Sequence, residues 1–222
     1  MKVSKTALSM AALSGVSGAL AFVPASSLAI TRSSGSQLAT RRSIQRSTVR
    51  MQFWKSPGPD PSTNLAKEPP LDKMKSDAEY KATMDPVAYS VLRQKATEPR
   101  SVTVARGGFD DHTEDGTYVC GCCGTPLYDS SHKFDCGCGW PGFWTNIKDA
   151  VYEERDKDGF RAEILCSSCG GHLGHVFRGE GFSNPPPNER HCVNSVSIGF
   201  IPRGKGPEDV QKCTYSGPVY GA

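Results

Sequence analysis

Two cysteine pairs with the spacing CxxC, each followed by glycine, restrict how this chain can fold. They are Cys120 and Cys123 in CGCCG, and Cys166 and Cys169 in CSSCG. In such a turn two thiolates point at one metal ion, and two turns supply the four sulfur ligands of a closed, structural zinc site. Soft thiolates also bind iron, but a closed four-sulfur site in a small β-domain favours zinc. The pairs predict one structural Zn²⁺ ion that joins separate strands and contributes to folding.

The cysteine content has two other interpretations. All nine cysteines follow residue 119 of the 222-residue chain. A secreted disulfide scaffold is usually shorter and has an even number of cysteines. A thioredoxin-like motif explains one CxxC but leaves the second pair without a purpose. Cys122 lies inside the first turn, and only Cys120 and Cys123 have the two-residue gap of a metal-binding turn.

Charge is unevenly distributed along the chain. Residues 1–59 carry eight of the 26 basic side chains and no acidic one, so residues 60–222 hold 18 basic side chains against 23 acidic ones. The basic character therefore belongs to the N-terminus. The acidic remainder disfavours nucleic acid as a partner, because a basic face is expected there.

The first 50 residues have the composition of a targeting presequence. Residues 1–21 have a basic start, a mildly apolar run and an AxA-like end, which is typical of a signal peptide. The run is shorter than the roughly 20 apolar residues of a transmembrane helix, so we expect no membrane span in the mature form. Residues 22–50 begin with Phe22, are rich in Ser, Thr and Arg, and resemble a transit peptide.

Together these segments resemble the bipartite presequences of algae with complex plastids, which predicts a location in the plastid stroma. The alternative is the secretory pathway, but secretion would place zinc thiolates in an oxidising space.

Three further regions follow the presequence. Residues 51–75 are rich in Pro and polar side chains and predict a linker. A helical hairpin is predicted over residues 76–95, where Ser76 and Glu79 resemble a capping box, and Asp85 precedes Pro86 as an N-cap. The main domain is predicted to cover residues 76–203. Residues 202–222 contain several Gly and Pro and show no periodicity. We therefore expect a loosely held tail, which follows the main domain and begins at residue 204.

After Thr97 the pattern is mostly that of β-strands. Strands are predicted at residues 117–120, and at 150–155 and 160–165 around the Asp158-Gly159 turn. In the last of these, Phe160 and Ile164 alternate with Glu163. One continuous strand is predicted over residues 192–201, because its alternate positions form one face.

Cys192 is the candidate nucleophile. It follows a long Pro-rich loop and begins a predicted strand, and Asn194 points to the same face. A cysteine acts as a nucleophile when a neighbouring base or cation stabilises its thiolate, and His172, His175 and Arg190 are close in sequence. Each histidine alone could be structural. Two histidines three residues apart, beside a cysteine pair, favour a functional role.

Cys138 lies in the aromatic-rich run GCGWPGFW. It is either a small buried hydrophobe or a resolving thiol that condenses with a sulfenic acid to form a disulfide. Trp140, Phe143 and Trp144 are either core residues or the lining of an apolar pocket that could hold a methyl group.

Five motifs resemble the type B methionine sulfoxide reductase family over residues 76–203, and in particular its plastid branch. They are TEPR (97–100), GCCGTPLY (121–128), KFDCGCGWPGFW (133–144), CSSCGGHLGHVF (166–177) and RHCVNSVSIGF (190–200). The resemblance implies a mainly β fold, a compact domain of two antiparallel sheets clamped by the zinc site, with a short helical N-terminal segment. It also implies an enzyme, expected to be a monomer, that reduces the R-epimer of methionine sulfoxide in oxidised proteins or as the free amino acid.

The same resemblance assigns roles to individual residues. Cys192 attacks the sulfoxide sulfur and becomes a sulfenic acid, which Cys138 resolves as a disulfide. Thioredoxin or a similar thiol reductant then reduces the disulfide. Trp140 receives the methyl group of the substrate. The polar residues around the reacting atoms are His172, His175 and Asn194, and His175 is the predicted acid that assists departure of the sulfoxide oxygen.

Some positions depart from the family pattern. Cys136 replaces a commoner Ser and could act as an alternative resolving thiol, as could Cys213. His191 stands where many members have Tyr. Arg178 and Glu180 replace an acidic pair, so no role is assigned to them.

Two other functions fit parts of the sequence. A zinc-ribbon binding module would need the cysteine pairs but neither Cys192 nor Cys138. A thiol–disulfide oxidoreductase acting on partner proteins would use the CxxC pairs for redox chemistry, and a zinc ion that persists under thiol reductant would remove both pairs from that duty.

Overall fold

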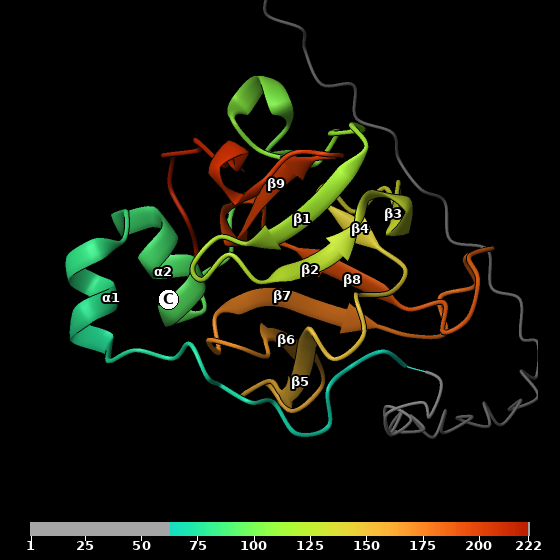
Figure 1. Cartoon of the computed structure of the whole chain (residues 1–222). Coiled ribbons are helices and arrows are strands. Elements are labelled where there is room, and N and C mark those ends of the chain that lie inside the picture. Colours follow the sequence, from blue (N-terminus) through green and yellow to red (C-terminus); the bar gives the residue numbers. More distant parts are fainter. Residues whose placement is uncertain (1–62, 222) are drawn as a thin grey trace, which may run out of the picture. The chain divides into compact units, whose positions relative to one another are not determined.

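Residues 63–221 are the part of the chain that the computed structural model describes, and they form two antiparallel sheets with two short helices beside them (Figure 1). The predicted presequence, residues 1–50, and the first part of the predicted linker lie outside the described residues. None of the described helices has the length and apolar character needed to cross a bilayer. The predicted fold class is confirmed: mainly β, with two antiparallel sheets and few helices.

The first sheet has four strands in the order β10-β9-β1-β2. Their bounds are Gln211–Lys212 for β10, Ile198–Pro202 for β9, Gly116–Cys120 for β1 and Pro126–Asp129 for β2. The second sheet has six strands in the order β3-β4-β8-β7-β6-β5. Their bounds are Lys133–Phe134 (β3), Gly142–Phe143 (β4), Arg190–Val193 (β8), His172–Phe177 (β7), Ala162–Cys166 (β6) and Val151–Arg155 (β5).

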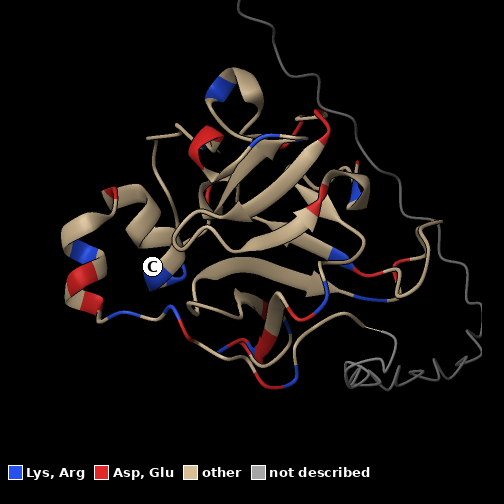
Figure 2. Cartoon of the chain, in the orientation of Figure 1, with Lys and Arg blue, Asp and Glu red and all other residues tan. Residues whose placement is uncertain are grey.

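The main core contains residues of both sheets. Its largest members are fully buried aromatic and aliphatic side chains: Tyr118, Leu127, Tyr128, Phe143, Ile164, Leu173 and Phe200. The ring of Tyr128 from the first sheet stacks on that of Phe143 from the second at 4.2 Å between centroids. Each such side chain stabilises the fold by about 1.5–3 kcal/mol through burial. The charged side chains lie along the ribbon with both signs interspersed (Figure 2).

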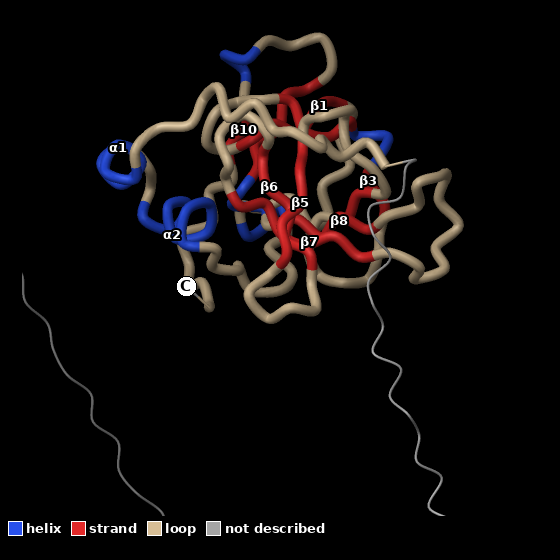
Figure 3. The backbone as a smooth tube through the Cα atoms, turned by 90° about the horizontal axis from the view of Figure 1, so that it is seen from below, coloured by secondary structure: helices blue, strands red, loops and turns tan. Residues whose placement is uncertain are grey.

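The predicted helical hairpin is confirmed as α1 (Asp77–Thr83) and α2 (Pro86–Gln94). Ser76 and Glu79 form the capping box of α1, and the Asp85 carboxylate caps α2 by accepting from Val87 N. The helix α2 contacts β7 and buries Val91 and Leu92. Both helices lie to one side of the strands (Figure 3). The caps and the apolar stripe therefore place α2 against the sheet that carries the candidate catalytic cysteine.

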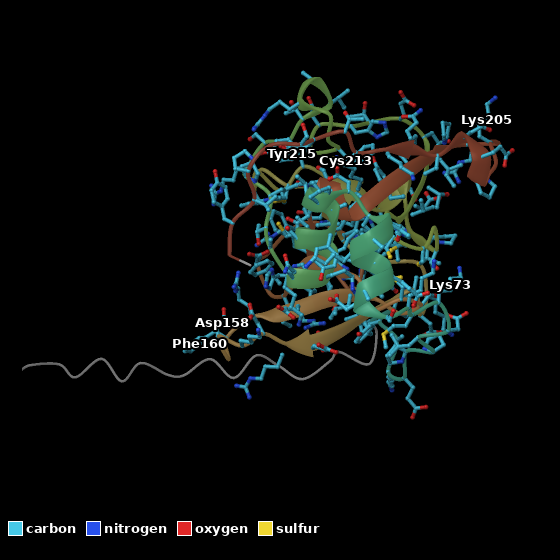
Figure 4. The ribbon with its side chains drawn as sticks, turned by 90° about the vertical axis from the view of Figure 1, so that its left-hand side faces the viewer. Lys73, Asp158, Phe160, Lys205, Cys213 and Tyr215 are labelled. Atoms are coloured by element: carbon cyan, nitrogen blue, oxygen red, sulfur yellow. A yellow bond between two sulfur atoms is a disulfide. The ribbon has the colours of Figure 1, made fainter. Side chains whose placement is uncertain are left out.

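The predicted β5–β6 hairpin is confirmed, but its face pattern is only partly right. Ile164 is fully buried as expected, whereas Phe160 is 74% exposed. Phe160 lies in the turn before β6 begins, and Figure 4 shows it with Asp158 at the tip of the hairpin. Glu163 was expected to be exposed on the opposite face, but it is buried, and Lys95 forms an ion pair that compensates the charge of its carboxylate.

The prediction of one continuous strand over residues 192–201 is wrong. The segment forms β8 in the six-stranded sheet and β9 in the four-stranded sheet, separated by a 3₁₀ turn, η3 (Ser195–Ser197). In this turn Ser195 N and Val196 N donate to the Glu98 carboxylate. The chain changes sheets here because these donors find a buried side-chain acceptor in place of a neighbouring strand.

The C-terminal segment is not loosely held, contrary to expectation. β10 pairs with β9, Thr214 N donates to Gly107 O, and the backbones of Thr97 and Tyr220 exchange hydrogen bonds. Three side chains of this segment pack against α2 and η3: Cys213, Tyr215 and Val219. Figure 4 shows Cys213 and Tyr215 close together at this edge of the domain.

The described part of the Pro-rich segment, residues 63–75, also packs on the domain. Leu65 is buried, and Ala66 N and Leu71 N donate to backbone oxygens of Val151 and Ser167.

Candidate active site and metal centre

Four cysteine sulfurs gather where the two sheets meet. Cys120 ends β1 and Cys123 lies in the following turn, while Cys166 ends β6 and Cys169 lies in the turn before β7. The four sulfur atoms all lie within 4.8 Å of one another, and the pairs Cys120–Cys169 and Cys123–Cys166 are 3.6 and 3.7 Å apart. A tetrahedron with Zn–S bonds of 2.3 Å has edges of about 3.8 Å. The cluster therefore has the composition and dimensions of a zinc site.

This cluster matches the predicted ligand set and does not include Cys122. Its ligands come in two pairs, one from each sheet, so an ion bound here would join the sheets as well as two turns.

A row of functional side chains crosses the six-stranded sheet. Glu163 on β6 is in register with His175 on β7, which is in register with Cys192 on β8, which is in register with Gly142 on β4. Residues in register on adjacent antiparallel strands project to the same face. The next position along β8, His191, points to the opposite face, where it is buried and contacts the Tyr128 hydroxyl. The predicted nucleophile and the predicted acid thus share the face away from the main core.

Cys192 is half-buried, and its sulfur lies 3.7 Å from the sulfur of Cys138. Burial raises the pKa of Cys192 to about 11, and the neighbouring Arg190 guanidinium opposes this rise. Arg190 is fixed by two hydrogen bonds to Glu180, at 2.6 and 2.7 Å, and by the ring of Phe177 at 4.0 Å. Glu180, to which the sequence assigned no role, orients the cation beside the thiol.

The two histidines differ in their environments. His172 is 1% exposed, and among residues 63–221 neither of its ring nitrogens has a hydrogen-bond partner. Burial lowers the pKa of His172 to about 3, so its imidazole is neutral at physiological pH. His175 lies beside it, with ring centroids 5.7 Å apart, and its Nε2 pairs with Asp156 Oδ2 at 3.0 Å. Burial also lowers the pKa of His175, against the opposing effect of Asp156.

Glu98 links the other two predicted site residues. Trp140 Nε1 donates to Glu98 O at 3.1 Å, and Glu98 N donates to Asn194 Oδ1 at 3.0 Å. The amide nitrogen of Asn194 also donates to Leu173 O, so both polar atoms of this side chain bind backbone groups. The side chain of Glu98 is buried and holds η3. In the sequence Glu98 is marked only by its place in the TEPR motif, and no local pattern predicts that its side chain is buried against η3.

Three further cysteines are the candidates for the resolving thiol: Cys136, Cys138 and Cys213. Cys136 and Cys138 form a disulfide, so the sulfur that faces Cys192 is already bonded to a second one. Cys213 lies in the apolar cluster of α2 and η3. The structure therefore brings together Cys136, Cys138 and Cys192, and places Cys213 in a different environment.

The fold and site define a class of protein: a two-sheet β-domain with a four-cysteine cluster that could hold a metal ion and, apart from it, two cysteine sulfurs, those of Cys138 and Cys192, that lie 3.7 Å apart. Residues 84–202 match the family model described as the SelR domain. Among the relatives, peptide methionine sulfoxide reductase B5 of Oryza sativa subsp. japonica is 51% identical over 130 residues, which cover 59% of this chain and 92% of the relative.

Two relatives from Arabidopsis thaliana give the same picture. Peptide methionine sulfoxide reductase B5 is 49% identical over 133 residues, covering 60% of this chain and 92% of the relative. The chloroplastic peptide methionine sulfoxide reductase B2 is 49% identical over 128 residues, which cover 58% of this chain and 61% of the relative. The chain belongs to the SelR family, and the predicted membership of the type B methionine sulfoxide reductases is confirmed. It is an oxidoreductase.

Proposed function

We propose that this enzyme reduces the R-epimer of methionine sulfoxide, free or in oxidised proteins, and so repairs oxidative damage. Family membership supports methionine sulfoxide as the substrate. The observation that carries the mechanism is the 3.7 Å separation of the Cys138 and Cys192 sulfurs on the face that also holds His175. Once the Cys136–Cys138 disulfide is reduced, a sulfenic acid formed on Cys192 has the Cys138 thiol within reach at that distance.

The first step transfers oxygen between two sulfur atoms. The Cys192 sulfur attacks the sulfoxide, the sulfoxide S–O bond breaks, and oxygen passes to Cys192 as a sulfenic acid while methionine leaves. Cys192 is oxidised by two electrons and the substrate sulfur is reduced by two. Protonation of the sulfoxide oxygen assists this step, and we assign it to His175, whose ring Asp156 positions. The thiolate forms beside Arg190, which stabilises its charge.

The remaining residues bind and orient the substrate. Buried, neutral His172 has both ring nitrogens available to a polar substrate atom. Trp140, fixed through Glu98 O, presents its ring to the methyl group. Asn194 acts as a positioning residue, because its amide fixes Glu98 and β7. The Cys192 sulfenic acid then condenses with the Cys138 thiol to give a disulfide and water, and thioredoxin or a similar dithiol restores both thiols.

The cysteine cluster is assigned to one structural Zn²⁺ ion held by Cys120, Cys123, Cys166 and Cys169. A closed four-sulfur site leaves no open coordination position, so the metal supplies stability and takes no part in the reaction. For location we propose the plastid, specifically the stroma of an alga with a complex plastid. Chloroplastic relatives and the composition of residues 1–50 support this assignment.

The test is turnover of separated R- and S-epimers of a methionine sulfoxide peptide by the full chain, with dithiothreitol and then with thioredoxin. We expect turnover of the R-epimer alone, and its loss by at least about a thousandfold in Cys192→Ser, since the nucleophile is gone. Cys138→Ser should keep the dithiothreitol-driven rate and lose the thioredoxin-driven rate. Cys213→Ser is the matched control and should retain both. A folded, zinc-loaded chain that turns over neither epimer would contradict the proposal and favour a binding module.

A further inference from the structure

The sulfur of Cys138 has two partners within reach, and the proposed function uses only one of them. It is bonded to Cys136 and lies 3.7 Å from Cys192. From the sequence, Cys136 was a candidate to replace Cys138 as the resolving thiol. The structure arranges the three sulfurs in series, with Cys138 in the middle.

We propose that Cys136 is a third redox residue that takes over the disulfide from Cys192 and presents it to the external dithiol reductant. This inference rests on the proposed function and extends it. The enzyme would then pass through two successive disulfides, Cys138–Cys192 and Cys136–Cys138, and we call this transfer the relay.

The local backbone is built to hold Cys136 at this place. The chain around it reverses between β3 and β4, and Gly137 adopts a positive φ of 64° with its N–H bound to Asp135 Oδ1 at 2.8 Å. Gly142 on β4 supplies the space, because a Cβ atom there would lie 2.9 Å from the Cys136 sulfur. Gly142 is itself in register with Cys192. Cys136 therefore lies over the position next to the nucleophile, on the row that carries the reaction.

The transfer is a thiol–disulfide exchange that needs no added oxidant. After the Cys192 sulfenic acid has condensed with Cys138, the Cys136 thiolate attacks the Cys138 sulfur. The Cys136–Cys138 bond forms, the Cys138–Cys192 bond breaks, and Cys192 leaves as a thiolate that takes up the proton released by Cys136. The number of electrons is unchanged. An external dithiol then reduces Cys136–Cys138 and becomes a disulfide itself.

The position of the final disulfide favours this order. Cys192 ends up as a thiol in the site where substrate binds, while the disulfide moves to the loop between β3 and β4. Gly137 at the centre of that loop is exposed, whereas Cys136, Cys138 and Cys192 are each half-buried. A reductant protein would approach the disulfide through this loop and leave the substrate site free. Freed in this way, Cys192 can attack a second sulfoxide before any reductant arrives.

This second attack predicts how many methionines each chain forms without reductant. Reduced, desalted full-length protein is mixed anaerobically with excess methionine-R-sulfoxide and no reductant, and methionine per chain is measured after acid quench. We expect two methionines per wild-type chain: one from the first cycle and one from a second attack that leaves Cys192 as a sulfenic acid. Cys136→Ser should give one, because its Cys192 stays in the Cys138–Cys192 disulfide. Cys213→Ser, which lies outside the relay, should give two.

Peptide mapping and sulfenic-acid labelling provide a second readout. After the reaction the wild type should contain a Cys136–Cys138 disulfide and a dimedone adduct on Cys192, and Cys136→Ser should contain Cys138–Cys192 without the adduct. Two results would overturn the relay and leave the proposed function intact. One is a single methionine per wild-type chain together with a Cys138–Cys192 disulfide. The other is two methionines per chain from Cys136→Ser. No methionine from folded wild type would remove the proposed function and the relay together.

Discussion

At the scale of single residues, Glu98 connects the stability of the site to pH. Its carboxylate is buried and accepts hydrogen bonds from Ser195 N and Val196 N at 2.7 and 2.9 Å. Burial raises the pKa of Glu98 to about 7, although these hydrogen bonds oppose the rise. In the unfolded chain the same group titrates near its ordinary value of 4.5. Between these two values the folded protein binds a proton that the unfolded chain has released.

This difference predicts how Glu98 affects unfolding. Because the folded state binds more protons, the free energy of unfolding contributed by Glu98 falls as pH rises from about 4.5 through 7, by roughly 3 kcal/mol in total. Urea unfolding of wild type and Glu98→Gln at several pH values measures this. Wild type should lose stability relative to the variant as pH rises. The lowered pKa of His172 has the opposite effect on stability as pH rises, but His172 is present in both proteins, so its contribution cancels in the comparison. A pH-independent difference would mean that the pKa of Glu98 is the same in the folded and unfolded chain, which would contradict the prediction.

At the scale of elements, the C-terminal segment shows what sequence periodicity can miss. Its half-buried side chains alternate with exposed ones: Cys213, Tyr215 and Val219 are inward, and Thr214, Ser216 and Tyr220 are exposed. This is the period of an extended strand, and it continues through Gly217 and Pro218, whose turn-forming character concealed it in the sequence. The segment clamps Thr97, which precedes Glu98, so it supports the candidate site from outside.

Removal of residues 211–222 should therefore destabilise the domain. The deletion removes β10 and exposes apolar surface on α2 and η3, and the burial of three half-buried side chains contributes about 2–3 kcal/mol in sum. Urea unfolding should show a lower midpoint. Deletion of only residues 221–222 leaves the Thr97–Tyr220 bridge in place and should have little effect. Equal stability of the two truncated chains would show that the segment is dispensable, as its composition suggested.

The boundary between β8 and β9 marks the limit of local sequence information. Short-range signals predicted the capping box at Ser76, the N-cap at Asp85 and the turn at Asp158, because each depends on neighbours within a few residues. The break after Asn194 depends on Glu98, which is 97 residues away from Ser195. Alternation alone continued the strand across this point. The pairing of His175 with Asp156 and of Arg190 with Glu180 likewise requires the register of the sheet.

At the scale of the whole molecule, the cysteine cluster lies where a bound ion would tie the two sheets together. Apart from the apolar core, the chain itself links the sheets where it crosses from β2 to β3 and from β8 to β9, and an ion held by the cluster would add a cross-link between the ends of β1 and β6. The CxxC spacing predicted which four cysteines gather into one cluster, since a metal-binding turn is local. That the two turns belong to different sheets followed only from the family resemblance and not from the spacing, because it depends on the path of the entire chain.

A cross-link of this kind predicts that zinc and folding are coupled. Purified wild type should contain about one zinc per chain by mass spectrometry, and Cys169→Ser should contain almost none. Apparent binding free energies of structural zinc are on the order of 10 kcal/mol, comparable with the whole stability of a domain. Cys169→Ser should thus lose its cooperative thermal transition. Cys122→Ser, a neighbour outside the cluster, should keep both metal and transition. If Cys169→Ser melted like wild type without metal, the core alone would hold the sheets, and the cluster would be free for redox chemistry.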